Sequence, residues 1–264
     1  MLQRRPLATR DVTGVGSLRA GPPVVVLDEI DSTNAEARRR AEAGAAGPVW
    51  LLGLRQTAGR GRRGRVWETG EGNLAATLLM TTDKAPAQAA QVSFVAALAV
   101  ADLLCAYAPA GLVSLKWPND PLLGGLKVSG ILIESGPRAA GGLWLAVGIG
   151  VNLARKPVDA ERPTTALGPH LNIPPPRAEE ALELLAAAFE RWSDVWERLG
   201  FPAIADAWTA RAHGLGEPCV ARLGAETLQG VAEGLDGDGA LRLRLPNGSI
   251  RRISAGDVFF GEVA

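Results

Sequence analysis

The chain has 264 residues, 47% of them hydrophobic, and its 28 basic residues balance 28 acidic residues. A chain of this length and composition can bury a large core, which predicts a globular protein. The zero net charge excludes a general basic field that would attract nucleic acid. Two widely separated cysteines, Cys105 and Cys219, show no metal-ligand spacing, which indicates a reducing compartment and a cytoplasmic protein. The longest apolar stretch, 92–107, is interrupted by Asp102, so we expect no membrane span.

The first part of the chain predicts strands mixed with helices. Residues 1–20 are polar and without period, and we expect an irregular leader. The predicted elements are a strand at 24–27, a helix that ends at Gly44, strands at 49–55 and 74–81, a buried helix at 88–107, and strands at 113–117, 128–134 and 143–151. Ser32 and Thr33 are expected to cap the first helix, because Thr33 and Glu36 have capping-box spacing.

The sequence pattern changes near residue 215, from a helical pattern to short alternating strands. A proline-rich loop at 155–177 leads to an amphipathic helix at 182–199, whose apolar residues recur at steps of three and four. From Gly216, short alternating strands separated by turns such as Asn247-Gly248 predict a small β-barrel. We therefore predict two domains, 1–215 and 216–264.

Residues 56–67, Gln-Thr-Ala-Gly-Arg-Gly-Arg-Arg-Gly-Arg-Val-Trp, form the most informative segment. Glycine lets the backbone adopt positive φ and approach a ligand closely, and arginine supplies forked donors that stay charged. Such a segment is suited to binding an anion. The alternatives are a solvated basic loop or a segment that binds RNA without sequence preference.

Only four of the basic residues are lysines: Lys84, Lys116, Lys127 and Lys156. Lys127 begins an apolar run, where an unpaired ammonium would be costly unless a carboxylate or phosphate meets it. The alternative is a surface lysine at a strand end. The turn that follows Lys116 contains Asn119 and Asp120, which could hold a metal ion or cap the turn.

Two further features set limits on the chemistry. The segment Gly148-Ile149-Gly150-Val151-Asn152 lacks the order of a dinucleotide or P-loop motif, and its glycines are expected to clear space beside a flat ligand. His170 and His213 have no partner at metal or triad spacing, so we expect neither to be a metal ligand or a catalytic residue.

Taken in order, these pieces resemble the biotin protein ligases. The residues that carry the resemblance are the segments 31–34 (Asp-Ser-Thr-Asn), 56–67, 116–120 (Lys-Trp-Pro-Asn-Asp), 127–132 (Lys-Val-Ser-Gly-Ile-Leu) and 148–152. The resemblance implies an α+β protein with a mixed-sheet catalytic domain related to class II aminoacyl-tRNA synthetases, followed by a small SH3-like β-barrel. It also implies that ATP activates biotin to biotinyl-5'-AMP. Biotin would then pass to a lysine in the biotin carboxyl carrier domain of acetyl-CoA carboxylase or a related carboxylase.

The resemblance also implies roles for individual residues. The biotin site would consist of Ser32, Thr33, Asn34, Gln56, Gly59, Arg60, Gly61, Arg62, Lys127 and Gly130, and the nucleotide site of Arg62, Arg65, Trp67, Asn119, Lys127 and Asn152. Lys127, Arg60 and Arg62 would neutralise the two anions that react, and Asp120 would orient the attacking amine or accept its proton. Mg²⁺ would accompany ATP, with Asn119 and Asp120 as candidate ligands. Residues 59–65 would form a lid, mobile without ligand, that keeps water from the adenylate.

Departures from the family pattern add further expectations. About twenty residues precede the first strand, too few for the winged helix-turn-helix of repressor forms, so we expect no DNA-binding role. No nucleic-acid or membrane partner is expected, and a homodimer is left open. Many relatives have Ala-Thr-Ser-Leu where this chain has residues 164–167, Thr-Thr-Ala-Leu, so position 166 lacks a hydroxyl.

Two other functions compete with biotin ligation. A lipoate or octanoate ligase would use the same catalytic fold, but the lipoyl enzymes lack the glycine-arginine run. A non-catalytic nucleic-acid-binding module would need stacking aromatics beside the arginines, and only Trp67 is near.

Overall fold

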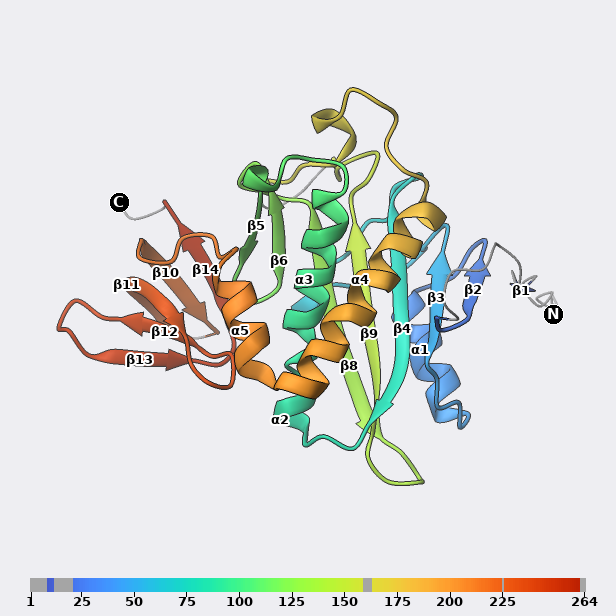
Figure 1. The fold of residues 1–264 in the computed structure, drawn as a ribbon, viewed down its shortest axis with the longest axis horizontal. Coiled ribbons are helices and arrows are strands. Elements are labelled where there is room, and N and C mark those ends of the chain that lie inside the picture. Colours follow the sequence, from blue (N-terminus) through green and yellow to red (C-terminus); the bar gives the residue numbers. More distant parts are fainter. Residues whose placement is uncertain (1–8, 12–20, 159–162, 225, 262–264) are drawn as a thin grey trace.

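A mixed six-stranded sheet forms the centre of the larger domain (Figure 1). The computed structural model describes residues 9–11, 21–158, 163–224 and 226–261. The strand order is β1-β2-β3-β4-β9-β8, from Thr9–Asp11, Val24–Leu27, Val49–Gly53, Leu74–Thr82, Leu143–Val151 and Ser129–Pro137. Only β2 and β3 pair in parallel, and every other neighbouring pair is antiparallel. The predicted mixed sheet is confirmed.

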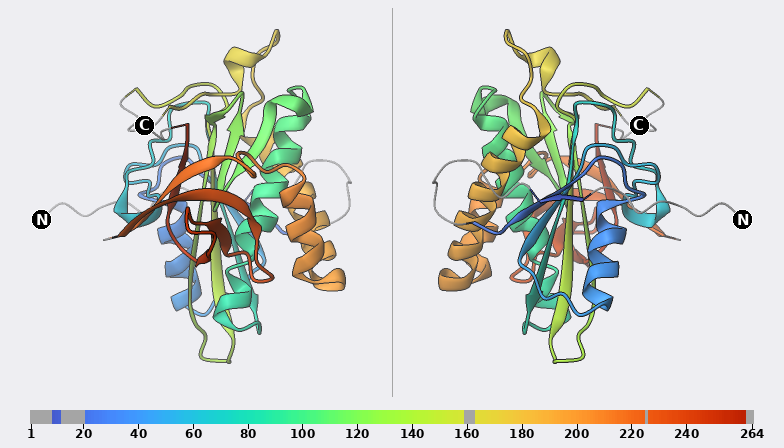
Figure 2. Two further views of the ribbon diagram at one scale, coloured as in Figure 1. Left: turned by 90° about the vertical axis from the view of Figure 1, so that its left-hand side faces the viewer. Right: turned by 90° about the vertical axis from the view of Figure 1, so that its right-hand side faces the viewer.

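Helices cover the two faces of this sheet unequally. α1 (Thr33–Glu42) lies on one face, and α3 (Val92–Cys105) and α4 (Ala178–Leu199) lie on the other (Figure 2). α4 is amphipathic and turns Leu182, Leu185 and Phe189 inward, as the three- and four-residue spacing predicts. The face that carries α1 is therefore the more open one. The glycine-arginine segment, residues 59–65, lies on that side.

α3 is the central helix of the core, and almost every side chain on it is buried. Within the described residues, one stretch, Pro86–Cys105, has the length and apolar composition of a membrane-spanning helix. In the fold, 67% of its most apolar window is buried against the sheet and α4. The predicted helix at 88–107 is in fact divided into α2 (Pro86–Ala89) and α3.

A three-stranded hairpin unit stands beside the central sheet. Its strands are β5 (Val113–Lys116), β6 (Asp120–Leu123) and β7 (Leu126–Lys127). The turn expected after Lys116 covers only residues 117–119, because Asp120 and Pro121 already pair with β5. In this register Lys116 lies opposite Asp120, and β7 then brings Lys127 to the same place.

The C-terminal domain is a five-stranded antiparallel sheet with the order β13-β12-β11-β10-β14. Its strands are Ile250–Ile253, Leu241–Arg244, Glu226–Leu235, Pro218–Leu223 and Asp257–Phe260. Leu241 and Leu243 are buried whereas Arg242 and Arg244 are exposed, as the alternation predicts. The indole of Trp117 donates a hydrogen bond to the Gly239 carbonyl at 3.0 Å, which ties this domain to the hairpin.

Several local expectations were wrong or incomplete. Residues 9–11, within the expected leader, form β1 along the edge of β2, because backbone pairing requires no side-chain pattern; the rest of 1–20 lies outside the described residues. Gly200, at φ 76°, ends α4, and a further helix, α5 (Phe201–Thr209), follows. Cys219 is buried and Cys105 half-buried, and both are free thiols. Burial raises the pKa of Cys219 to about 11.

Candidate functional site

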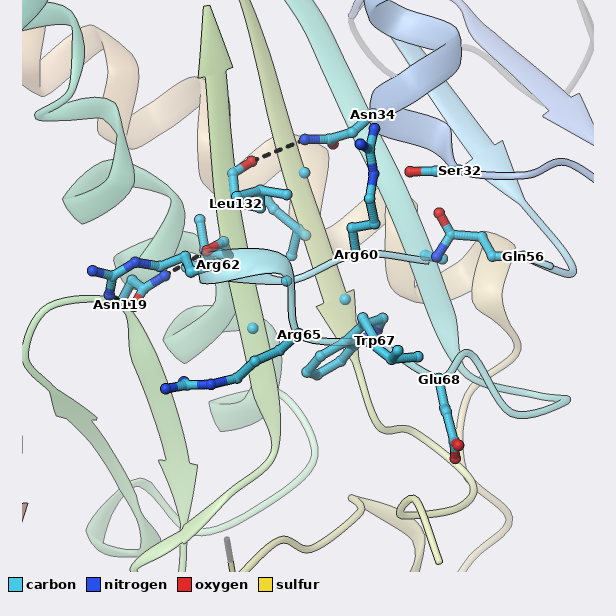
Figure 3. A pocket seen from close by; sticks show the side chains of 18 of the residues that line it. Ser32, Asn34, Gln56, Arg60, Arg62, Arg65, Trp67, Glu68, Asn119 and Leu132 are labelled. Carbon is cyan, nitrogen blue, oxygen red and sulfur yellow. Dashed lines mark hydrogen bonds between the residues drawn. The ribbon is translucent and has the colours of Figure 1, made fainter. Parts of the chain in front are cut away.

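A cavity of about 330 Å³ opens on the α1 side of the sheet, beneath the glycine-arginine segment (Figure 3). It is lined by α1, residues 60–62 and 65–68, strands β4, β8 and β9, the hairpin and Asp257 of the C-terminal domain. The predicted residues that it brings together are Ser32, Thr33, Asn34, Gln56, Arg60, Gly61, Arg62, Arg65, Trp67, Asn119, Asp120, Lys127, Gly130 and Asn152. Segments remote in sequence thus meet in one place.

Gly59 is the predicted site residue that supports the wall without lining it. A Cβ on Gly59 would lie 2.3 Å from the Trp67 carbonyl oxygen. The Gly59 carbonyl accepts a hydrogen bond from the Trp67 amide at 3.0 Å. Glycine is needed here because the two ends of the loop approach each other too closely for a side chain.

Uncharged polar groups form one end of the cavity, where β2 leads into α1. Ser32 holds the N-cap position of α1, but its side chain makes no capping hydrogen bond, and Thr33 lies inside the helix. The N-cap position predicted for Ser32 is confirmed, whereas side-chain capping and the capping box of Thr33 and Glu36 were wrong. The Thr33 hydroxyl instead lies 2.8 Å from the Thr77 hydroxyl, and Gln56 Oε1 accepts the Thr33 amide at 2.8 Å. These groups can bind a neutral, hydrogen-bonding head group.

Asp31 fixes the turn that presents this polar end. Both of its carboxylate oxygens accept hydrogen bonds from Arg39 at 2.8 Å, and one also accepts the Ser32 amide at 2.7 Å. The hydrogen bond from Arg39 lowers the pKa of Asp31. Asp31 therefore positions the binding residues and stays ionised.

The glycine-arginine segment crosses the middle of the cavity as a short 3₁₀ turn, Arg62–Gly64. Arg63 adopts φ 57°, a left-handed conformation that is unusual outside glycine. The side chain of Arg60 extends into the cavity toward the end where Asn34 lies (Figure 3). Arg60, Arg62 and Arg65 of this loop line the cavity, whereas Arg63 does not.

Arg62 is anchored at the far end of the cavity. It donates to Asn119 Oδ1 at 3.0 Å (Figure 3). Burial lowers the pKa of Arg62, although Asp257 and Asp120 act in the opposite direction. A guanidinium remains charged even so, and a partly desolvated one interacts strongly with an incoming anion.

Asp257 is a site residue that the sequence analysis missed. It begins β14, is 8% exposed, and accepts hydrogen bonds from Arg65 at 2.6 Å and Arg63 at 3.2 Å. The C-terminal domain thus supplies an anion to the glycine-arginine segment. A Gly-Asp pair at a strand start is too common to have marked this residue in the sequence.

Trp67 forms one wall of the cavity by lying flat against two glycines of the sheet. A Cβ on Gly130 would lie 2.8 Å from the indole, and one on Gly150 would lie 2.3 Å from its Nε1. A Cβ on Gly148 would lie 2.1 Å from Asn34 Oδ1. The expectation that Gly148 and Gly150 clear space for a flat ligand was therefore wrong, because side chains of the protein fill that space.

Asp120 is held between two lysines at the floor of the cavity. Lys127 Nζ lies 2.5 Å and Lys116 Nζ 3.1 Å from its two carboxylate oxygens. Burial acts to raise the pKa of Asp120, but the two ammonium groups outweigh it and the pKa is lowered. The carboxylate that Lys127 needs is thus Asp120, and in this arrangement Asp120 is a weak base.

Pro157 and Thr164, from the described part of the proline-rich loop, line the remaining side of the cavity. The Thr165 amide donates to the Lys127 carbonyl at 2.9 Å, and the Asn152 side chain donates to the Thr165 carbonyl at 3.1 Å. Thr165 also contacts His170, with Oγ1 and Nε2 2.9 Å apart. Ala166 is buried in this segment. The loop therefore sets the positions of Lys127 and Asn152.

The residues suggested for Mg²⁺ do not fit a metal site. Both carboxylate oxygens of Asp120 have ammonium partners, and Asn119 Oδ1 accepts from Arg62. Among the described residues, no group of three or more His, Cys, Asp or Glu could hold a metal ion. A cation at this site would therefore have to arrive with an anionic ligand.

Comparison with known proteins gives matches over both domains. The model of the biotin/lipoate A/B protein ligase family matches residues 27–152, and that of the biotin protein ligase C terminal domain matches residues 214–261. A biotin–[acetyl-CoA-carboxylase] ligase of Paracoccus denitrificans is 47% identical over 243 residues, covering 89% of this chain and 100% of that protein. The bifunctional ligase/repressor BirA of Bacillus subtilis is 31% identical over 247 residues, covering 91% of this chain and 75% of that protein.

A solved structure agrees with these matches. The biotin protein ligase from Aquifex aeolicus, determined in complex with biotin and ATP, superposes with a TM-score of 0.76 at 26% identity. The superposition covers 90% of this chain and 98% of that one. The predicted arrangement of a mixed-sheet domain followed by a small barrel is confirmed.

Proposed function

The chain belongs to the biotin protein ligase family, and we propose that it is a biotin–[acetyl-CoA-carboxylase] ligase, which uses ATP to join biotin to a protein lysine. The substrates are biotin, ATP and the carrier domain of a biotin-dependent carboxylase. The observation that carries this proposal is a single cavity with a neutral polar end, a cationic middle and a wall formed by Trp67.

In the first step, a carboxylate oxygen of biotin attacks the α-phosphorus of ATP. A new P–O bond forms, the bond to the β-phosphate breaks, and pyrophosphate leaves. Two anions must approach each other, so the site has to offset their repulsion. We assign this role to Arg60, Arg62 and Lys127, which line the same cavity.

The ends of the cavity suit the two substrates differently. The ureido ring of biotin is uncharged, so hydrogen bonds hold it better than cations do. We assign that ring to Ser32, Thr33, Asn34 and Gln56. Gly61 and Gly130 would lie beside the aliphatic chain of biotin, which joins the ring to the carboxylate. Trp67, Arg65, Asn119 and Asn152 then remain for the nucleotide. These assignments are expectations for a substrate complex.

In the second step, the lysine amine of the carrier attacks the acyl carbon of the adenylate, a C–N bond forms, and AMP leaves. The amine must first lose a proton. Asp120 is a poor acceptor while it holds both lysines, because these keep its pKa low. We therefore assign Asp120 to positioning Lys127, and to orienting the amine once Lys127 turns to the phosphate.

An acyl-adenylate hydrolyses when water reaches it, so the site must exclude water. The segment 59–65 already crosses the cavity, and we propose that it closes further around the intermediate. A domain division near residue 215 and a cytoplasmic location remain predictions, and no oligomeric state is predicted. A role in DNA binding is not proposed.

The first step can be tested without a carrier protein. Purified chain incubated with biotin, ATP and Mg²⁺ should release pyrophosphate and retain biotinyl-5'-AMP, identified by mass spectrometry after denaturation. Omission of biotin gives the background of ATP hydrolysis. Lipoate in place of biotin tests the alternative ligase, and adenylation of lipoate but not biotin would overturn the proposal.

A further inference from the structure

Thr77 is a buried polar residue directly behind the uncharged end of the cavity. It lies in the middle of β4, in a strand that is otherwise apolar from Leu74 to Met80, and it is 0% exposed. Its hydroxyl lies 2.7 Å from Asn34 Oδ1 and 2.8 Å from Thr33 Oγ1. A hydroxyl this deeply buried needs its hydrogen bonds, and here both partners line the site.

The surroundings of Asn34 determine which way its amide faces. Asn34 Nδ2 donates to the Leu132 carbonyl at 3.3 Å (Figure 3). It also donates to Glu134 Oε2 at 2.8 Å. Both of these atoms only accept, so the oxygen of the amide is the atom that faces Thr77. Gly148 leaves the space for this arrangement, because a Cβ there would lie 2.1 Å from Asn34 Oδ1.

The direction of each proton in this cluster then follows. Asn34 Oδ1 cannot donate, so the single proton of the Thr77 hydroxyl points to it. The 2.8 Å contact between Thr77 and Thr33 must therefore use the proton of Thr33. Gln56 Oε1 is farther from the Thr33 hydroxyl, at 3.2 Å, and already accepts the Thr33 amide at 2.8 Å. Thr33 thus turns its proton away from the cavity and its free lone pair toward it.

We propose that Thr77 is a positioning residue that fixes the Thr33 hydroxyl as a hydrogen-bond acceptor toward the ligand. The site then selects a head group that carries an N–H donor. This inference rests on the proposed function and deepens it: the ureido ring of biotin has N–H donors, whereas the dithiolane ring of lipoate has none. Thr77 thereby contributes to specificity without lining the cavity.

The test compares Thr77→Val, which keeps the shape but removes the hydroxyl, with Thr77→Ser, which keeps the hydroxyl. Biotin affinity is measured by calorimetry, with ATP affinity and thermal unfolding as controls for folding. Thr77→Val should weaken biotin binding by about 10- to 100-fold, since a buried partner loses its hydrogen bond. It should raise the KM for biotin with kcat within about threefold. Thr77→Ser should bind biotin within about threefold of wild type.

A double-mutant cycle with Thr33→Val shows whether Thr77 acts through Thr33. If it does, the double variant binds biotin no more weakly than Thr33→Val alone. Equal biotin affinity of wild type and Thr77→Val, equal loss in the Ser and Val variants, or additive losses in the cycle would each overturn the inference. Wild-type protein that does not bind biotin would instead overturn the proposed function, and this inference with it.

Discussion

Arg65 of the glycine-arginine segment donates a hydrogen bond to Asp257 of the C-terminal domain across 2.6 Å, although the two residues are 192 positions apart in the chain. Arg63 reaches the same carboxylate at 3.2 Å. One buried anion in the small domain therefore fixes the loop that crosses the cavity. The small domain thus acts on the site through the loop and through Trp117.

Replacement of Asp257 by Asn should loosen this loop. Trypsin cleaves after arginine, so we expect cleavage within 59–65 of the free protein to become several-fold faster, because the loop opens more often once it loses a charged anchor. Asp238→Asn is the matched control, since Asp238 pairs with exposed Arg252 within the same domain. Equal cleavage rates in all three proteins would contradict an anchoring role for Asp257.

Bound biotin and ATP should also change the rate at which trypsin cleaves within residues 59–65. If residues 59–65 close over the intermediate, wild-type protein incubated with biotin and ATP should be protected from trypsin in this segment. Mass spectrometry of the fragments identifies the cleaved bonds. Equal protection with and without ligand would count against a lid.

Lys127 is expected to be the most important cation for adenylate formation. Lys127→Ala should slow pyrophosphate release by about 100- to 1,000-fold, the usual cost of removing one group that stabilises developing charge. Lys116→Ala, which removes the other partner of Asp120, should have a smaller effect, and Lys84→Ala, whose lysine pairs with Glu197, should have none. A normal rate in Lys127→Ala would remove our main catalytic assignment.

The wall formed by Trp67 should be sensitive to a single methyl group. Gly150→Ala places a Cβ against the indole, so Trp67 must shift, and we expect a loss of about 1–3 kcal/mol in unfolding free energy and weaker ATP binding. Gly111→Ala is the control, because a Cβ at Gly111 meets nothing within 4 Å. Thermal unfolding and calorimetry with ATP measure both effects. Unchanged ATP affinity in Gly150→Ala would show that Trp67 does not form part of the nucleotide site.

The lowered pKa of Asp120 predicts how the free energy of unfolding depends on pH. Its pKa is lowered in the folded protein, so its contribution to stability is fully present above its ordinary pKa of 3.8 and is lost as pH falls through the lowered value. Asp120→Asn should cost roughly 3 kcal/mol near pH 7, because it leaves two lysines without their anion. Urea unfolding should show this difference shrinking below about pH 4. A difference that stays constant to pH 3 would contradict the ion-pair account.

Local sequence singled out the segments that line much of the cavity, because glycine, arginine and lysine stand at unusual places in them, and the family resemblance then named the individual site residues. Lys127 at the start of an apolar run pointed to a carboxylate or phosphate partner as one of two alternatives, and the strand periodicities predicted most of the strands, whereas the mixed sheet was implied by the family resemblance. What these signals share is that each can be read within a few neighbouring residues.

The pairings inside the site could not be predicted in the same way. Asp120 meets Lys127 through the register of a hairpin, and Arg65 meets Asp257 through the packing of two domains. The glycines at 148 and 150 were misinterpreted for the same reason, since Asn34 and Trp67 come from other segments. Thr77 carries no signal in the sequence, because an isolated threonine is ordinary in a strand.

The central claim is that this cavity makes biotinyl-5'-AMP and passes biotin to a carrier lysine. The most direct measurement is mass spectrometry of a biotin carboxyl carrier domain after incubation with the purified chain, ATP, Mg²⁺ and biotin. We predict the mass of one biotin added with loss of one water, only when ATP is present, and no addition on a carrier whose target lysine is replaced by arginine. An unmodified wild-type carrier would contradict the account. Modification by lipoate in preference to biotin, when both acids are supplied, would contradict it as well.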